Sequence, residues 1–426
     1  MRFVIFVIGS VFSLVLNSCH RIDPAERLDS MQDNAHEINE LSLDVPFSSD
    51  TSYFEWPYFV IVKPLDTLPG GLNYFTELQK LSLFLNRLTS LPEEVGELKK
   101  LAELDLSFNR FEEFPLVIHR LGNLKILRMQ HNKLRDYPIS LPKVTHLYLQ
   151  SNKISKLLPK FCDQHALEYL DMSENMLQTL PDEIGNLMNL SILLLQRNQL
   201  QQLPPSINKL KNLYELDLSS NKLSLLPPQI GELLELKILL LGGNLFTKIP
   251  DEIRYLSQLS KLRLSDNAIE DLPTGLQFLT KLEILVARNN NLSVLPREFD
   301  NLKSLVELDL AENDFQSVPE AVLGMSSIRF LNLSSNPISE LPIEIANLTE
   351  LENLYISGTN IGALPAELSH CKNLRILDVR NSRITDLPVE LLQLPRLEKV
   401  LIEDVQLTEA QKVSLHENFG NIMQFR

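Results

Sequence analysis

The sequence predicts an α/β solenoid: a curved horseshoe of stacked repeats with a parallel sheet on its concave face and short helical turns on its convex face. Two observations predict this fold. Asparagine returns every 23 residues over most of the chain, and leucines stand at fixed positions around each asparagine. A period of this length indicates small units that share one continuous core, and not two or three separate globular domains.

The asparagine column has one irregular step, of 20 residues between Asn132 and Asn152. Thr359 and Ser382 continue the register beyond its last member. The column consists of Asn86, Asn109, Asn132, Asn152, Asn175, Asn198, Asn221, Asn244, Asn267, Asn290, Asn313 and Asn336.

The unit around Asn221 shows what each position does. Leu216 and Leu218 alternate with polar residues and so face one side of a short strand. Pro227 suits the first turn of a short helix. The pattern L-x-x-L-x-L-x-x-N-x-L followed by x-x-L-P-x-x-I-x-x-L resembles the leucine-rich-repeat family. That resemblance implies the horseshoe fold and a structural asparagine column, whose amides hydrogen-bond the backbone of adjacent turns.

Four segments follow from this register. Residues 1–18 are expected to be a signal peptide, residues 19–57 a tether and possible N-terminal cap, and residues 58–407 a solenoid of about 14 full repeats with degenerate end repeats. Tyr58, Val60 and Leu65 fit a degenerate repeat one step before Asn86. Residues 408–426 are expected to be a C-terminal cap helix that Thr408 and Gln411 begin with a capping box and Gly420 ends after Phe419.

The N-terminus carries an export signal. Arg2 precedes an apolar run from Phe3 to Leu16, which is too short to span a bilayer and typical of a signal peptide. The run ends in Leu-Asn-Ser-Cys19, which resembles the bacterial lipobox, although Asn17 replaces the usual small residue. The resemblance implies lipidation of Cys19 and an outer-membrane lipoprotein of the bacterial envelope, facing the periplasm or the exterior. A plain secretory signal or an uncleaved anchor is the alternative.

Several functions are disfavoured by composition. The net charge of −15 comes without any basic block, so no nucleic-acid partner is expected. No Ser–His–Asp set or Cys–His pair shares a repeat in a geometry that favours nucleophilic attack, so neither an enzyme nor a cofactor or metal is expected. His131 and His146 fall at opposite ends of adjacent strands. Gly242-Gly243 lacks the Lys-Ser/Thr of a phosphate loop and is interpreted as a small-residue gap on the concave face.

Two sets of outward strand positions are candidate contact surfaces. Large aromatics and arginine, which are enriched at binding hot spots, form the first set: Phe84, Phe108, Arg128, Tyr148 and Tyr169. The alternative interpretation is that they are ordinary cross-strand neighbours that stabilise the sheet. The second set is an apolar ladder that recurs every 46 residues: Leu194, Leu240 and Val286. Charged repeats lie between these apolar ones, with Glu215/Asp217, Lys261/Arg263 and Glu307/Asp309.

These observations favour a non-catalytic scaffold, lipid-anchored at the bacterial envelope, that recognises a protein partner through its concave face. Two alternatives stay open. One is a self-assembling structural or adhesive surface protein. The other is a glycan-binding protein, since Tyr and Phe can stack on sugars.

Overall fold

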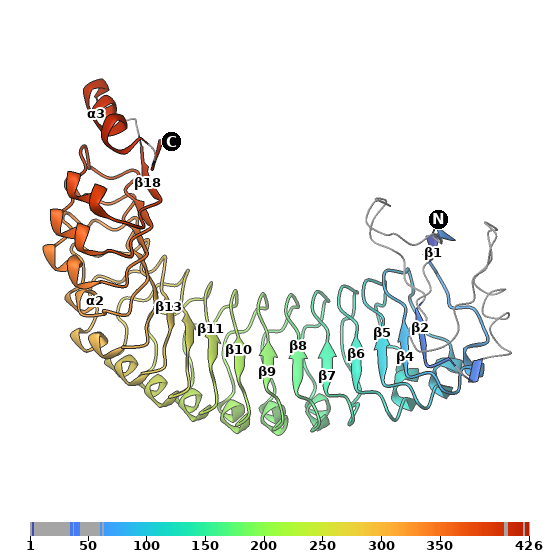
Figure 1. Cartoon of the computed structure of the whole chain (residues 1–426). Coiled ribbons are helices and arrows are strands. Elements are labelled where there is room, and N and C mark those ends of the chain that lie inside the picture. Colours follow the sequence, from blue (N-terminus) through green and yellow to red (C-terminus); the bar gives the residue numbers. More distant parts are fainter. Residues whose placement is uncertain are drawn as a thin grey trace. The chain divides into compact units, whose positions relative to one another are not determined.

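The structure, a computed structural model, describes residues 2–3, 35–36, 38–42, 60–61, 64–403, 408–420 and 422–425. The chain forms two compact units, Met1–Leu200 and Gln201–Arg426. Figure 1 labels their helices and strands along the sequence. Each unit is described by itself. Apart from Arg2–Phe3, the predicted signal peptide lies outside the described residues, as do the lipidation site Cys19 and most of the predicted tether.

Parallel strands pair in chain order in both units. In the first unit the described strands of this sheet are β2 (Glu40–Ser42), β4 (Lys80–Ser82), β5 (Glu103–Asp105), β6 (Ile126–Arg128), β7 (His146–Tyr148), β8 (Tyr169–Asp171) and β9 (Ile192–Leu194). In the second unit they are β10 (Glu215–Asp217), β11 (Ile238–Leu240), β12 (Lys261–Arg263), β13 (Ile284–Val286), β14 (Glu307–Asp309), β15 (Phe330–Asn332), β16 (Asn353–Tyr355), β17 (Ile376–Asp378), β18 (Lys399–Ile402) and β19 (Met423–Phe425). In neither unit do the described first and last strands pair with each other, so each sheet is open.

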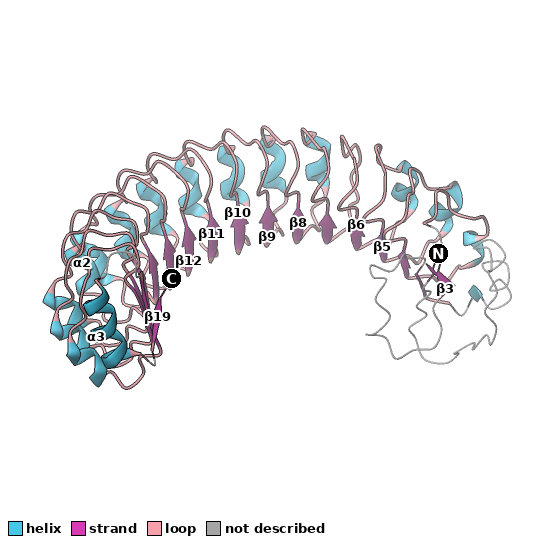
Figure 2. Cartoon of the chain, turned by 90° about the horizontal axis from the view of Figure 1, so that it is seen from above, coloured by secondary structure: helices cyan, strands magenta, loops and turns pink. Residues whose placement is uncertain are grey.

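Short helical turns lie on the outer side of each arc, and the strands line its inner side (Figure 2). All but one of the described turns between strands are 3-10 helices. In the first unit they are η3 (Leu72–Tyr74), η4 (Glu93–Glu97), η5 (Leu116–Arg120), η6 (Pro159–Asp163) and η7 (Asp182–Asn186). In the second unit they are η8 (Pro205–Lys209), η9 (Pro228–Glu232), η10 (Asp251–Tyr255), η11 (Thr274–Phe278), η12 (Arg297–Asn301), α2 (Glu320–Leu323), η13 (Ile343–Asn347), η14 (Ala366–His370) and η15 (Val389–Gln393). This is the solenoid that the sequence predicts, with a parallel sheet inside and helical turns outside.

The 23-residue period sets the strand register. Leu216 pairs with Leu239, and Leu239 with Leu262, so equivalent leucines stack in a column. All three side chains are fully buried. Because a three-residue strand buries too little surface to be stable alone, this shared column holds neighbouring repeats together.

The asparagine column is a hydrogen-bonded ladder, as the family resemblance implies. Asn244 Nδ2 donates to the carbonyl oxygens of Leu218 (2.9 Å) and Leu241 (3.0 Å), and Asn244 Oδ1 accepts from the Leu223 amide (3.0 Å). The residue before each asparagine turns the chain with a positive φ, as Ser220 does with φ 55°. One side chain therefore satisfies backbone groups in two successive repeats.

The N-terminal end differs from the sequence prediction. The strand that pairs with β4 is β2 (Glu40–Ser42), not the segment around Tyr58 and Val60. Val60 and Ile61 form β3 (Val60–Ile61), which pairs antiparallel with β1 (Arg2–Phe3). The second half of this degenerate repeat is where the pattern places it, because the Leu65 amide donates to Asn86 Oδ1 at 2.9 Å. An insertion between strand and turn breaks the period, which explains why spacing alone selects the wrong strand.

The C-terminal end contains more than the expected cap helix. Helix α3 spans Glu409–Phe419, and Thr408 and Gln411 form the reciprocal capping box that the sequence predicts. The predicted segment 408–426 is not all helix, because Met423–Phe425 form β19, which pairs parallel with β18. The chain thus ends by adding one more strand to the sheet.

Candidate binding surface

Four side chains of β6, β7 and β8 form a continuous stack, which we call the strand-face cluster: Arg128, His146, Tyr148 and Tyr169. The Arg128 guanidinium carbon lies 5.2 Å from the centre of the Tyr148 ring, a cation–π contact. The Tyr148 and Tyr169 ring centres are 4.8 Å apart, and the His146 ring stacks on Tyr169 at 5.9 Å. All four side chains are half-buried, so the cluster is held in place yet accessible.

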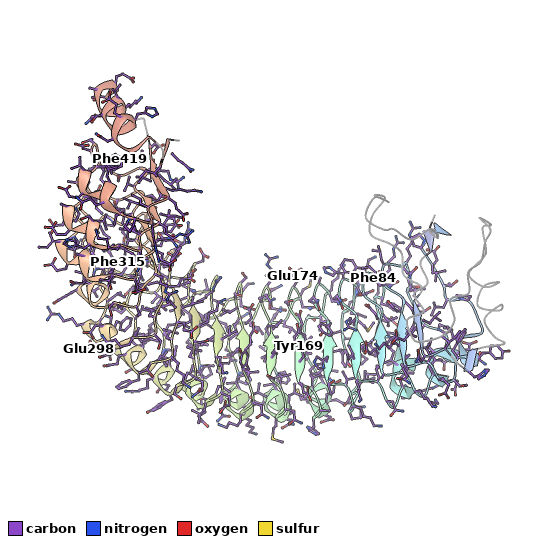
Figure 3. All side chains as sticks on the ribbon, in the orientation of Figure 1. Phe84, Tyr169, Glu174, Glu298, Phe315 and Phe419 are labelled. Atoms are coloured by element: carbon purple, nitrogen blue, oxygen red, sulfur yellow. The ribbon has the colours of Figure 1, made fainter. Side chains whose placement is uncertain are left out.

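Three rings beyond the strand ends form a second group, the edge cluster: Phe84, Phe108 and His131. Phe84 and Phe108 meet edge to face at 5.2 Å, and Phe108 stacks on His131 at 4.1 Å. Phe108 and His131 occupy the positive-φ position before the ladder asparagine. Figure 3 shows Phe84 at the rim beyond the strands and Tyr169 at the level of the strands.

The five residues selected from sequence therefore fall into two clusters. Arg128, Tyr148 and Tyr169 come together on the strands, whereas Phe84 and Phe108 pack beyond the strand ends. His131 and His146 are further members of these clusters that sequence reasoning considered only as metal ligands. Their positions in the repeat register were the available signal, since each is one repeat from an aromatic at the same position.

Charged groups surround both clusters in paired form. Arg128 Nη1 lies 3.9 Å from a Glu103 carboxylate oxygen. Farther along the rim, the Ser151 hydroxyl donates to the Glu174 carboxylate at 2.6 Å, and Arg197 lies 2.9 Å from it. The Ser151 hydrogen bond, with the Arg197 charge, lowers the pKa of Glu174. Glu174 is therefore ionised at neutral pH.

The predicted apolar ladder is weaker than the sequence suggested. Leu194 and Leu240 are half-buried, but Val286 is only 9% exposed and offers little surface to a partner. The register also places Arg263 between Leu240 and Val286. The charged repeats thus interrupt the ladder, and its residues are poor candidates for one continuous apolar contact.

A second aromatic pair in the second unit was missed. The ring centres of Phe330 and Tyr355 lie 5.1 Å apart on β15 and β16. Beside them Arg380 makes a bidentate pair with Asp378, at 2.9 and 2.6 Å. Burial raises the pKa of Tyr355, and the Asp378 charge adds to the shift.

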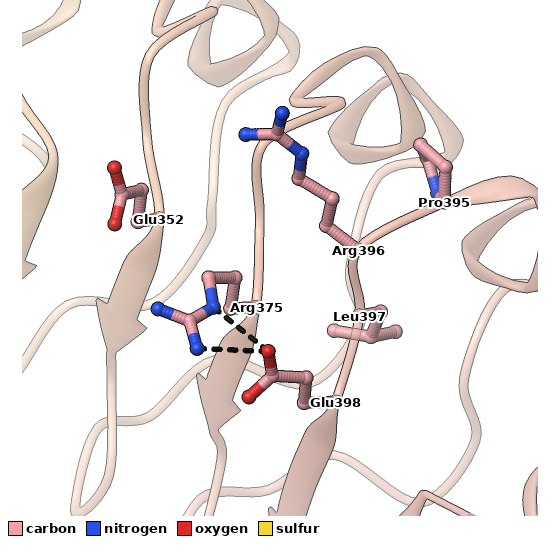
Figure 4. Close-up of a pocket in the computed structure, with 6 residues that line it drawn as sticks. All are labelled: Glu352, Arg375, Pro395, Arg396, Leu397 and Glu398. Carbon is pink, nitrogen blue, oxygen red and sulfur yellow. Dashed lines mark hydrogen bonds and ion pairs between the residues drawn. The ribbon is translucent and has the colours of Figure 1, made fainter.

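One hollow lies near the end of the second unit, at the start of β17 and β18 (Figure 4). Arg375 Nε and Nη2 contact one Glu398 carboxylate oxygen at 2.9 and 2.8 Å, and Arg396 donates to Asn373 at 2.8 Å. The lining residues are Glu352, Arg375, Pro395, Arg396, Leu397 and Glu398. The lining contains no Ser, Cys or His, and both of its arginines are hydrogen-bonded to neighbouring side chains. We therefore interpret the hollow as a structural feature of the sheet edge.

Groups with reactive chemistry are shielded in both units. Cys162 and Cys371 are buried free thiols, and burial raises their pKa to about 12 and about 11 respectively, so both are protonated at neutral pH. Among the described residues, no three His, Cys, Asp or Glu side chains are grouped to hold a metal ion. No helix within the described ranges is long and apolar enough to cross a membrane.

Stacked parallel strands, buried leucine columns and short outer turns together define a repeat solenoid. Models of the leucine-rich repeat match most of its length. "Leucine rich repeat" covers residues 76–134 and 142–200, "Leucine-rich repeat region" covers residues 224–325, and a further "Leucine Rich Repeat" model covers residues 212–233 and 327–348. The chain belongs to the leucine-rich-repeat proteins, whose fold is typical of non-catalytic, protein-binding scaffolds.

Solved structures from bacteria and plants share this fold. A leucine-rich-repeat protein of Leptospira interrogans has a TM-score of 0.76 at 27% identity, over 95% of this chain and 100% of that chain. The plant peptide hormone receptor RGFR1, in complex with RGF2, has a TM-score of 0.67 at 26% identity, over 84% of this chain and 61% of that chain. The functional domain of InlJ from Listeria monocytogenes has a TM-score of 0.69 at 19% identity, over 87% of this chain and 75% of that chain, and shows the fold alone. No curated protein sequence matches the chain.

Proposed function

We propose that the chain is a non-catalytic scaffold that binds a protein partner through the inner face of its first unit, with the strand-face cluster as the main contact. The observation that carries this proposal is the stack of Arg128, Tyr148 and Tyr169 on adjacent strands. Tyrosine and arginine are the residue types that dominate binding hot spots.

The geometry of the cluster supports a binding role over a purely structural one. Each ring is already immobilised by its neighbours, so little side-chain entropy is lost when a partner docks. The rings remain half-buried, at strand positions that alternate with the buried leucines. By contrast, the aromatic residues that serve only the core, such as Phe161 and Phe315, are fully buried.

The test is the pair of changes Tyr148→Ala with Tyr169→Ala, assayed by capture of partners from envelope and host extracts. Loss of two hot-spot anchors commonly exceeds 2 kcal/mol, roughly thirtyfold in affinity. We expect capture to be lost while the melting temperature falls by no more than a few degrees. Glu93→Ala with Glu183→Ala on the outer turns is the matched control and leaves capture intact.

Other outcomes would relocate or reject this surface. If the tyrosine pair is silent and Leu240→Asp alone abolishes capture, the contact lies on the second unit. If only the outer pair matters, the inner-face proposal is wrong.

Two alternative kinds of partner, a glycan and a second copy of this chain, can be tested separately. A glycan partner is favoured by the tilted Tyr148 and Tyr169 rings, 4.8 Å apart, on which a sugar can stack. It predicts a glycan-array signal that the tyrosine pair removes. Self-association predicts a concentration-dependent shift in size-exclusion chromatography of the wild-type chain.

We further propose that Cys19 carries a lipid that anchors the scaffold to the bacterial envelope, as an outer-membrane lipoprotein facing the periplasm or the exterior. The apolar run from Phe3 to Leu16 and the Leu-Asn-Ser-Cys19 sequence support it. An anchor of this kind would hold the solenoid near the membrane, where envelope or external proteins are the available partners.

A further inference from the structure

The second unit carries three bands of charge on its inner face. Glu215 and Asp217 lie on β10, Lys261 and Arg263 on β12, and Glu307 and Asp309 on β14. Each pair occupies the first and third strand positions, whose side chains leave the sheet on the same side. Across the sheet the signs therefore run negative, positive, negative.

The cations of the middle band have no ion-pair partner. Within the part of the chain that the structure describes, no carboxylate lies within 4.0 Å of Lys261 or Arg263. Five other cations on or beside the inner faces are paired: Lys80 with Glu40, Arg128 with Glu103, Arg197 with Glu174, Arg288 with Glu312, and Arg380 with Asp378. An unmatched basic pair is unexpected in a chain of net charge −15.

Apolar strands keep the three bands apart. The register places Lys261 between Ile238 and Ile284, and Arg263 between Leu240 and Val286. Two strand spacings, about 10 Å, separate neighbouring bands. Among the described residues, no ion pair within 4.0 Å joins one band to the next. The charges are thus held apart by Ile and Leu side chains that are themselves half-buried.

A side-chain-free gap adjoins the bands at the rim. Gly242 and Gly243 follow β11, and Gly243 has a φ of 68°. A Cβ at Gly242 would lie 3.2 Å from the Ser265 carbonyl oxygen, and one at Gly243 would lie 3.2 Å from Ser220 Oγ. These close approaches and the positive φ explain why glycine stands at both positions, so the rim directly after β11 carries no side chain.

We propose that β10–β14 form a docking surface for an amphipathic α-helix of a protein partner, lying across the strands with one face that reads basic, apolar, acidic, apolar, basic. The surface is separate from the strand-face cluster, so this inference does not depend on the proposed function of the first unit. Its occupant follows from the order of charge on the sheet and from the spacing of the strands.

The spacing argument selects a helix over an extended segment. Neighbouring strands are about 4.8 Å apart, and successive turns on one face of an α-helix are about 5.4 Å apart. Residues at i, i+3, i+7, i+10 and i+14 therefore advance about 21 Å, against about 19 Å for the four spacings from β10 to β14. Extended residues on one face recur about every 6.6 Å and fall out of register after one strand.

The test uses the full chain and a fluorescein-labelled helical peptide on an Ala/Gln background, with Lys, Leu, Glu, Leu and Lys at those five positions. Fluorescence anisotropy gives its affinity. The matched peptide exchanges the signs, with Glu, Leu, Lys, Leu and Glu. We expect the first peptide to bind at least tenfold more tightly, and added salt to reduce the difference.

Charge reversal on the middle band then identifies the site. The double variant Lys261→Glu with Arg263→Glu should bind the first peptide at least tenfold more weakly. Changing the peptide's central Glu to Lys should restore the affinity. Lys281→Glu with Lys303→Glu makes the same change of charge at exposed positions off the bands and should leave affinity unchanged. The double variant Tyr148→Ala with Tyr169→Ala should bind the peptide with wild-type affinity. This result would distinguish the helix-docking surface from the strand-face cluster of the first unit.

The proposal is overturned if the wild-type chain does not discriminate between the two peptides, or if the reversed variant keeps wild-type affinity with an unchanged melting temperature. Binding of a heparin oligosaccharide that depends on Lys261 and Arg263, without any peptide binding, would also overturn it. That result would assign the band to an anionic glycan.

Discussion

At the scale of single residues, the ladder asparagines contribute most to the order of the backbone. Asn244 is representative. Its Oδ1 accepts a hydrogen bond from the Leu223 amide, and its Nδ2 donates to the Leu241 carbonyl of its own repeat and the Leu218 carbonyl of the preceding one. Thr359 and Ser382 keep only part of this. Thr359 Oγ1 donates to Ile356 at 2.8 Å, and Ser382 Oγ to Val379 at 2.6 Å, both within their own repeat.

Asn244→Ala should therefore destabilise the repeats around β10 and β11 by roughly 1–3 kcal/mol, because it leaves the buried Leu223 amide without its acceptor. The Leu218 and Leu241 carbonyl oxygens each keep one donor, Asn221 Nδ2 and Asn267 Nδ2. Hydrogen exchange of the β10 and β11 amides measures this local opening. Thr359→Ala removes one bond within a repeat and should cost about 1 kcal/mol. Equal, small effects at the two sites would show that the cross-repeat bonds add nothing.

At the scale of elements, α3 and β19 cover the last repeat of the second unit. Helix α3 places Phe419, which is 3% exposed, over the last repeat, and Leu391 and Leu394 line the same end. Strand β19 then pairs with β18. Without these elements the leucine column of the last repeat would meet water, which is why solenoids need capping elements.

Phe419→Ala should remove the main apolar contact of this cap. Large-to-small changes of buried Phe cost about 3–5 kcal/mol, and in a repeat array the loss stays near the end where it is made. We expect faster hydrogen exchange in β18 and β19 and unchanged exchange in β11. The control Val413→Ala removes a side chain that is 55% exposed and should have little effect. Uniformly faster exchange through the second unit would contradict local capping.

At the scale of the whole molecule, the proposed anchor can be tested independently of any partner. In a bacterial host, the wild-type chain should incorporate a radiolabelled acyl chain and partition into the membrane fraction. Cys19→Ser removes the thiol that forms the thioether and should abolish labelling, while the far-ultraviolet spectrum of the isolated protein stays that of the wild type. Labelling that persists in Cys19→Ser would show that the lipobox interpretation is wrong.

The sequence predicts which residues of the binding surface face outward, but not which rings stack on one another. Tyr148 and Tyr169 were accessible from sequence, because the register shows which strand positions face outward. The stacking of Tyr169 with His146, and that of Phe108 with His131, depends on side-chain rotamers and on the positive-φ turn, neither of which the sequence period specifies.

The sequence alone determined the repeat length, the buried leucine and asparagine columns, the parallel stacking and the α3 capping box, because each of these follows from local spacing. Tertiary structure decided which strand joins β4, where the chain adds β19, and that Val286 is covered while Lys261 and Arg263 stay unpaired within the described chain. The physical reason is that spacing specifies which face a side chain takes. An insertion between strand and turn, or packing between neighbouring side chains on that face, is settled only when the repeats stack.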